Sequence, residues 1–163
     1  MKPALRFLAA ALLMCSAAAH AAGGGGGGAG GADASDAASS DPVIVSARAA
    51  IAKNDWNAAQ AGLKQALAAN PKNADYHNLY AYSVRKGGNA DMALVFMHYD
   101  EALRLDPKHR GAHEYSGEAY LSVDDLPKAK AHLAALDKLC FFGCEEYADL
   151  KKAVAAYEAS HKR

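Results

Sequence analysis

The sequence has no excess of charge of either sign, which bears on the class of partner it can bind. Lys and Arg residues number 18, and Asp and Glu residues also number 18. Without the amino-terminal Lys2 and Arg6, 16 basic residues remain against 18 acidic ones, a difference of −2. Binding to nucleic acid needs a row of basic side chains opposite the phosphates. The sequence offers no such row, so we do not expect nucleic acid as a partner.

Motifs typical of enzymes are missing as well. The sequence contains no Gly-x-Ser-x-Gly elbow, no His-Glu-x-x-His motif and no cysteine with an evident base partner. Several carboxylates lie near one another, but they are explained without acid–base catalysis. Glu114 and Glu118 would face solvent or a groove, and Asp124 and Asp125 would form a turn. We therefore expect a protein that is not an enzyme and that holds no cofactor.

The amino-terminal apolar run, residues 7–15, is too short to span a bilayer, so we expect no stable transmembrane segment. A short basic segment, residues 1–6, precedes the run. Residues 19–21, Ala-His-Ala, follow it as a small-x-small cleavage site. This order is typical of a secretory signal peptide. We expect residues 1–21 to be removed on export and the protein to be periplasmic.

An alternative for the same segment is a lipoprotein signal, in which Cys15 is retained and acylated. Bacterial lipoprotein signals have a small residue immediately before the cysteine, whereas this sequence has Met14. Under this alternative the protein would be a structural lipoprotein.

The next segment, residues 22–41, is rich in Gly, Ala and Ser. Its apolar content is too low for a packed core, so we expect a flexible tether. A glycine run can also indicate phosphate binding. Here no strand is expected before it and no Gly-Lys-Ser/Thr sequence follows it, so a nucleotide site is not expected.

Residues 42–163 contain a repeated pair of small residues whose members are twelve positions apart. The step between pairs is 34 residues (47 to 81) and then 36 (81 to 117), which indicates a helical repeat array. Small residues let two antiparallel helices pack closely. The pairs are Ala47 with Ala59, Ala81 with Ala93, and Gly117 with Ala129.

The sequence from residue 74 onward resembles the tetratricopeptide repeat (TPR) family. The third unit has a small residue and an aromatic residue on its first helix, Gly117 and Tyr120, and a small residue on its second, Ala129. Residues 101–107, EALRLDP, have the family's repeat ending. The resemblance implies an all-α, right-handed solenoid of helical hairpins. We expect three repeats, at residues 42–73, 74–109 and 110–141, and a capping helix at residues 144–160.

The second unit departs from this pattern. Ala66 follows Ala59 by 7 positions, but Ala102 follows Ala93 by 9, so the unit holds two extra residues. Either its internal turn is longer and Val95 takes the packing place of Ala93, or its second helix is bulged. We favour the longer turn.

In the TPR family the first helices of the repeats line a concave groove that binds a peptide or protein segment. The resemblance therefore implies a protein interaction scaffold, for which we expect a role in envelope assembly or secretion. Ordinary solvated helix positions are the alternative interpretation of the same residues. The groove positions in this sequence are Arg48, Asn78, Tyr82, Arg85, Glu114, Tyr115 and Glu118.

Some members of the family bind a carboxyl terminus through a clamp of Lys, Asn and Arg residues. This sequence keeps Asn78 and Arg85 but has Glu114 and Glu118 where clamp residues would be needed. Two acidic residues would repel an incoming carboxylate, so we favour a ligand with basic groups opposite the third unit.

Two cysteines remain in the predicted mature protein, Cys140 and Cys144. An oxidising compartment favours a structural disulfide between them. The alternative is a metal- or redox-active periplasmic protein that uses Cys140 and Cys144, with His132 as the nearest candidate for a further ligand. His109 and His113 are four residues apart and could also share a metal on one helix face. No third ligand is evident for that pair, so we interpret His109 as a helix-start residue and His113 as a packed side chain.

Overall fold

The computed structural model describes residues 40–88 and 90–161, and the secondary structure in these residues is α-helical throughout. The predicted signal peptide, residue Cys15 and nearly all of the tether lie outside them. None of the described helices is both long and apolar enough to cross a bilayer. The helices are α1 (Pro42–Ala52), α2 (Trp56–Ala69), α3 (Ala74–Lys86), α4 (Met92–Leu105), α5 (Arg110–Ser122), α6 (Leu126–Leu139) and α7 (Glu145–Ser160).

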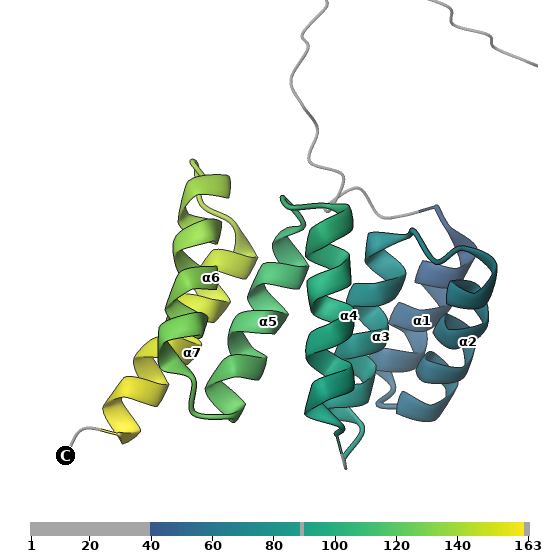
Figure 1. Ribbon diagram of the computed structural model, residues 1–163, viewed down its shortest axis with the longest axis horizontal. Helices are drawn as coiled ribbons and strands as arrows, with labels where there is room; N and C mark the ends of the chain where they lie inside the picture. The colour runs from purple at the N-terminus through teal and green to yellow at the C-terminus, as the bar shows by residue number, and fades with distance from the viewer. Residues whose placement is uncertain (1–39, 89, 162–163) are drawn as a thin grey trace, which may run out of the picture. The chain divides into compact units, whose positions relative to one another are not determined.

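The helices form three antiparallel hairpins followed by a single helix (Figure 1). Each helix packs against the next one in the chain, from α1 to α7. The first helices of the hairpins also contact one another, α1 with α3 and α3 with α5, and α7 packs on both α5 and α6. The first helices therefore lie next to each other along one side, as the predicted solenoid requires.

Aspartate caps start the second helix of each hairpin. Asp55, Asp91 and Asp125 each accept a hydrogen bond from a backbone N–H in the first turn of the helix that follows. Such caps satisfy amides that have no partner inside the helix. In the first and third hairpins the residue before the cap, Asn54 or Asp124, has a positive φ of 57° or 61°. Asn and Asp tolerate this conformation better than most residues, which explains their place in the turns.

The second hairpin has the longer turn. Its helices are joined by residues 87–91, whereas residues 53–55 and 123–125 join those of the first and third hairpins. Helix α4 is regular throughout its length. The two extra residues therefore lie in the loop, and the alternative of a bulged helix is wrong.

This longer turn changes which residue packs at the helix crossing. Val95 is 0% exposed, whereas Ala93 is exposed to solvent. Val95 is the fourth residue of its helix, as Ala59 and Ala129 are of theirs. The favoured alternative, in which Val95 takes the packing place of Ala93, is therefore confirmed, and the simple pairing of Ala81 with Ala93 does not hold.

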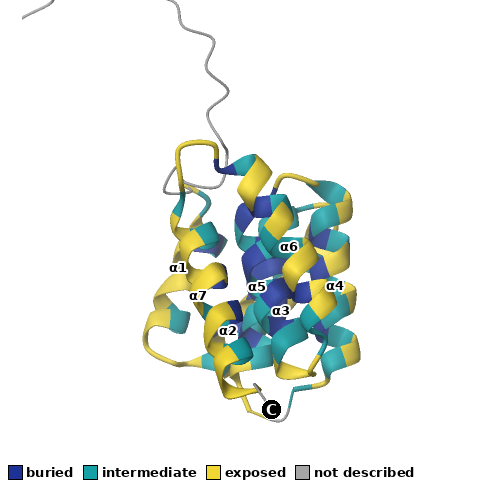
Figure 2. Ribbon diagram, turned by 90° about the vertical axis from the view of Figure 1, so that its left-hand side faces the viewer, coloured by how far each residue is buried: buried dark blue, intermediate teal, exposed yellow. Residues whose placement is uncertain are grey.

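The buried side chains form three clusters along the row of helices. Figure 2 shows buried residues on the inward sides of the helices and exposed residues on their outer sides. Each cluster is shared by neighbouring hairpins or by a hairpin and α7, so no hairpin has a core of its own. Stacking therefore supplies most of the stability of these short helices. The clusters centre on Ile44, Leu63 and Leu79; on Ala81, Val95 and Tyr99; and on Leu136, Leu150 and Val154.

Helix α7 covers the end of the third hairpin. Leu150 is 0% exposed and lies against Gly117 of α5, where a Cβ atom would come within 2.5 Å of Leu150 Cδ2. Residue 117 therefore has to be small to admit α7. The predicted disulfide is present and joins Cys140, at the end of α6, to Cys144, which caps α7.

Candidate functional site

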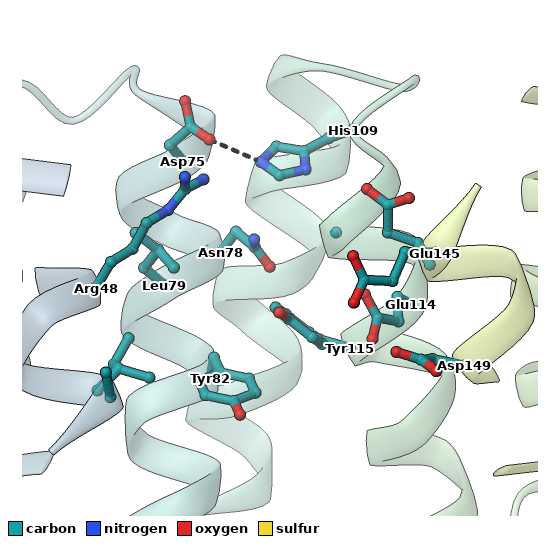
Figure 3. A pocket seen from close by; sticks show the side chains of 14 residues that line it. Arg48, Asp75, Asn78, Leu79, Tyr82, His109, Glu114, Tyr115, Glu145 and Asp149 are labelled. Carbon is teal, nitrogen blue, oxygen red and sulfur yellow. Dashed lines mark ion pairs between the residues drawn. The ribbon is translucent and has the colours of Figure 1, made fainter. Parts of the chain in front are cut away.

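An open pocket of about 440 Å³ is lined by the first helices and by the start of α7. Five of the seven predicted groove residues line it, and Figure 3 shows their side chains around the pocket. They come from α1, α3 and α5, so the row of first helices builds the pocket wall. These five residues are Arg48, Asn78, Tyr82, Glu114 and Tyr115.

The other two predicted groove residues, Arg85 and Glu118, are not part of the pocket lining. They bind each other, with Arg85 Nη2 2.7 Å from Glu118 Oε2. The side chain of Arg85 is only 11% exposed. This pair joins α3 to α5 within the wall of the groove.

Two tyrosines form the aromatic part of the wall. The ring centroids of Tyr82 and Tyr115 lie 4.5 Å apart, and Trp56 meets Tyr82 edge-on at 6.3 Å. Burial is the main cause that raises the pKa of both tyrosine hydroxyls, so the rings stay neutral at physiological pH. Fixed neutral aromatic rings offer a large contact area at a low entropic cost.

The charges around the pocket are mostly negative. Five carboxylates line it, against one arginine, Arg48. Two of the carboxylates have partners: Asp75 lies 3.3 Å from His109 Nε2, and Glu146 lies 3.6 Å from Arg110 Nε. The other three form no ion pair with a described residue. They are Glu114, Glu145 and Asp149.

Glu114 is the most buried of these three, with 8% of the residue exposed. Burial, reinforced by the neighbouring carboxylates of Glu118 and Asp149, raises its pKa to about 8. An ionised carboxylate is poorly solvated in such a place, and nearby negative charges disfavour it further. Without a ligand, Glu114 is therefore largely protonated at neutral pH.

Asn78 presents a polar atom that has no partner in the described part of the chain. The residue is 4% exposed, and no hydrogen bond reaches its Oδ1. Gly111 lies alongside, where a Cβ atom would come 3.2 Å from Asn78 Nδ2. A small residue at this position therefore leaves room for the amide at the pocket wall.

The fold, and not the sequence, resembles that of a known protein. No family model matches the sequence, and no curated protein matches it. Among solved structures, the first TPR domain of the human RPAP3 protein superposes with a TM-score of 0.60 at 16% sequence identity. The match covers 73% of this chain and 94% of that one. The fold is that of a TPR domain.

This likeness confirms the predicted resemblance at the level of the fold. In the TPR solenoid, α1, α3 and α5 are the first helices of the repeats, and α7 is the helix that caps the third. The repeat pattern did not predict that α7 adds acidic residues to the groove. Glu145 and Glu146 fall in the predicted capping helix at residues 144–160, which lies beyond the end of the repeat pattern.

His109 and His113 both form hydrogen bonds with other residues of the domain. His109 caps α5 by accepting a hydrogen bond from Ala112 N–H, 3.2 Å away. His113 Nδ1 lies 3.1 Å from His132 Nδ1 on the second helix of the same hairpin. His109 and His113 thus contact different partners, in agreement with the interpretation of a helix start and a packed side chain.

The cysteines of the TPR domain are bonded to each other and are therefore not thiolates. In the described residues, the group of potential metal ligands that lies close enough together consists of Cys140, Cys144 and Glu146. Metal binding by cysteine requires the thiolate, and His132 is not in the group. The disulfide thus removes two of the three donors.

Proposed function

We propose that this protein is a TPR interaction module that binds an extended segment of another protein in the groove along α1, α3 and α5. One observation carries the proposal: the tilted rings of Tyr82 and Tyr115 lie against each other in the wall of an open pocket that also presents Arg48 and Asn78. Aromatic and arginine side chains often supply the anchoring energy of protein interfaces.

A segment in this groove would contact three successive repeats. An extended chain can place alternate side chains on the wall, so that the tyrosines bind apolar parts and the polar groups bind backbone or charged parts. A pocket of about 440 Å³ has room for one or two such side chains.

The proposed place of action is the periplasm, with a role in envelope assembly or secretion. The signal-like order of residues 1–21 supports export. The bond between Cys140 and Cys144 is compatible with an oxidising compartment. In such a role the module would hold a client protein while the client is assembled or exported.

Site-specific photo-crosslinking in the native host tests the proposal. A photoreactive residue replaces Arg48, which is exposed at the groove, or in a matched variant Lys64, which is exposed on α2. We expect position 48 to give a crosslink to one protein, with the joined peptides mapping to one segment of that partner. Identical products at both positions, or no product at position 48, would contradict the proposal.

A further inference from the structure

Carboxylates from two helices converge at one end of the groove. Glu114 projects from α5, and Glu145 and Asp149 project from the first two turns of α7 (Figure 3). None of the three is paired with a described cation. Arg48, the arginine of the pocket lining, comes from α1, two first helices away from α5.

The position of Glu114 is unfavourable for the protein alone, because Glu114 is buried whereas Glu145 and Asp149 are exposed to solvent. Buried carboxylates in proteins are normally paired or accept several hydrogen bonds, because an unpaired charge is poorly solvated there. Glu114 has neither form of compensation from the described residues, although it lines an open pocket. A cation delivered from outside would supply the missing partner.

Asn78 is an independent observation that points to the same kind of ligand. Its Oδ1 is a buried acceptor without a donor, and buried acceptors are nearly always hydrogen-bonded. Figure 3 shows the amide of Asn78 directed from α3 toward the space in front of α5. A ligand that donates hydrogen bonds to both Asn78 and Glu114 would satisfy both groups.

We propose that this end of the groove is a binding site for an arginine side chain of the bound protein segment. The inference rests on the proposed function and names the chemistry that the groove selects. A guanidinium group has five donors in a rigid plane, so it can bind the carboxylate of Glu114 in a bidentate manner and also donate to Asn78. Its flat face stacks on aromatic rings such as Tyr115. A lysine ammonium group lacks this planar set of donors.

Binding of arginine is coupled to ionisation of Glu114. The titratable groups that face Glu114 are Glu118 and Tyr115 on α5, Tyr82 on α3, and Glu145, Glu146 and Asp149 on α7. Burial and the negative charges of the neighbouring glutamates and Asp149 keep Glu114 largely protonated up to about pH 8 in the free protein, whereas the tyrosines are neutral there. Arginine stays charged throughout this range. Affinity for arginine therefore rises between pH 6 and pH 9, as the proton on Glu114 is lost.

The test uses the full chain and four probes. These are acetyl-Gly-Ser-Gly-Arg-Gly-Ser-Gly-amide, the same peptide with lysine or with citrulline in place of arginine, and spermidine. Citrulline has nearly the shape of arginine but no charge. NMR signals of the Asn78 side-chain amide and the Glu114 carboxyl carbon report occupancy. We expect the arginine peptide to bind about 10-fold more tightly than the citrulline peptide, with the lysine peptide between them.

Two variants complete the test. E114Q keeps the shape of the side chain and should reduce the preference for arginine over citrulline to less than about 2-fold and abolish its pH dependence. D137N, which removes one charge from the exposed surface of α6, should leave both unchanged. Equal binding of arginine and citrulline, an arginine preference that persists in E114Q, or occupancy by spermidine alone would overturn the inference. Crosslinking at position 48 would still support the groove function in each of those cases, so the two failures are distinguishable.

Discussion

Arg85 on α3 and Glu118 on α5 form an ion pair across the interface of the second and third hairpins, with 2.7 Å between Nη2 and Oε2. The pair is mostly withdrawn from solvent, at 11% and 29% side-chain exposure. Both residues were predicted to contact a ligand, and the structure places them against each other. Their interaction connects the first helices that form the groove.

Replacing Arg85 with alanine should destabilise the domain. The substitution leaves Glu118 partly buried without its partner, so we expect the free energy of unfolding to fall by about 2 to 3 kcal/mol. R104A is the control, because Arg104 also binds a glutamate, Glu101, but on the exposed surface of a single helix. R104A should have little effect. Urea unfolding followed by circular dichroism measures both changes, and equal losses would contradict the structural role of the Arg85 pair.

A methyl group at residue 117 should weaken the attachment of α7. In G117A the new Cβ atom would approach Leu150, and the steric cost would exceed the gain in helix propensity, for a net loss of about 1 kcal/mol. Gly62 is the matched control, since it lies within α2 and a Cβ atom added there would meet no other atom within 4 Å. G62A should stabilise by up to about 1 kcal/mol. Thermal and urea unfolding compare the two variants, and a stabilising G117A would contradict the close packing of α7.

Two histidine pairs should make the stability of the fold sensitive to acid. His113 Nε2 lies 3.1 Å from Pro107 O, and a carbonyl can only accept, so Nε2 carries the proton. Nδ1 of His113 then accepts from Nδ1–H of His132. The second hairpin repeats this arrangement with His77 and His98, whose Nδ1 atoms are 2.8 Å apart. Protonating the acceptor Nδ1 of His113 would break its hydrogen bond to His132, and burial is the main cause that lowers the pKa of His113, His132 and His98.

The expected pH profile follows from the direction of these pKa shifts. Burial, with a smaller contribution from His113, lowers the pKa of His132 from 6.5 to about 4. The unfolded chain therefore binds more protons, so this stability is complete above pH 6.5 and is lost as pH falls to 4. H132Q should lose less stability than the wild type over that interval, by about 2 kcal/mol after allowance for partial solvent screening. H161Q, on the exposed end of α7, is the control and should follow the wild type.

Glu114 should lower the stability of the fold at high pH, whereas His132 lowers it at low pH. Its pKa is raised to about 8 in the folded protein from 4.5. The folded state therefore holds the proton more tightly, and the associated stability is present below pH 4.5 and is lost as pH rises through 8. E114Q should match the wild type at about pH 5 and be more stable at about pH 9 by about 2 kcal/mol, discounted for partial exposure. Urea unfolding at the two pH values measures the difference, and the same difference at both would contradict a buried, unpaired carboxylate.

The repeat architecture could be predicted because it depends on close contacts that only small residues permit. The spacing of Ala47, Ala81 and Gly117 marks one helix crossing in each repeat, and seven helices were predicted between residues 42 and 160. The structure has seven helices in that range of the described residues. The twelve-residue spacing alone pointed to Ala93 and not Val95, because it cannot show how many of the residues belong to the turn.

The chemistry of the groove was less predictable, because it depends on distances between helices. A helical pattern can place Arg85 and Glu118 on the same side of the solenoid, but it does not show that their side chains meet. Glu145 and Asp149 lie at the site because α7 packs on α5. This packing depends on Gly117 and Leu150. That contact lies outside the repeat pattern, so its effect on the groove appeared only in the structure.

The most direct test of the groove function is NMR mapping with the partner segment identified by crosslinking. That segment is titrated into the full chain, and the side-chain nitrogen signals of Arg48 and Asn78 are followed together with backbone signals of every helix. We predict that the largest shifts occur at these two side chains and at Tyr82 and Tyr115. Shifts concentrated on the exposed surfaces of α2, α4 or α6, with Arg48 and Asn78 unchanged, would contradict the account.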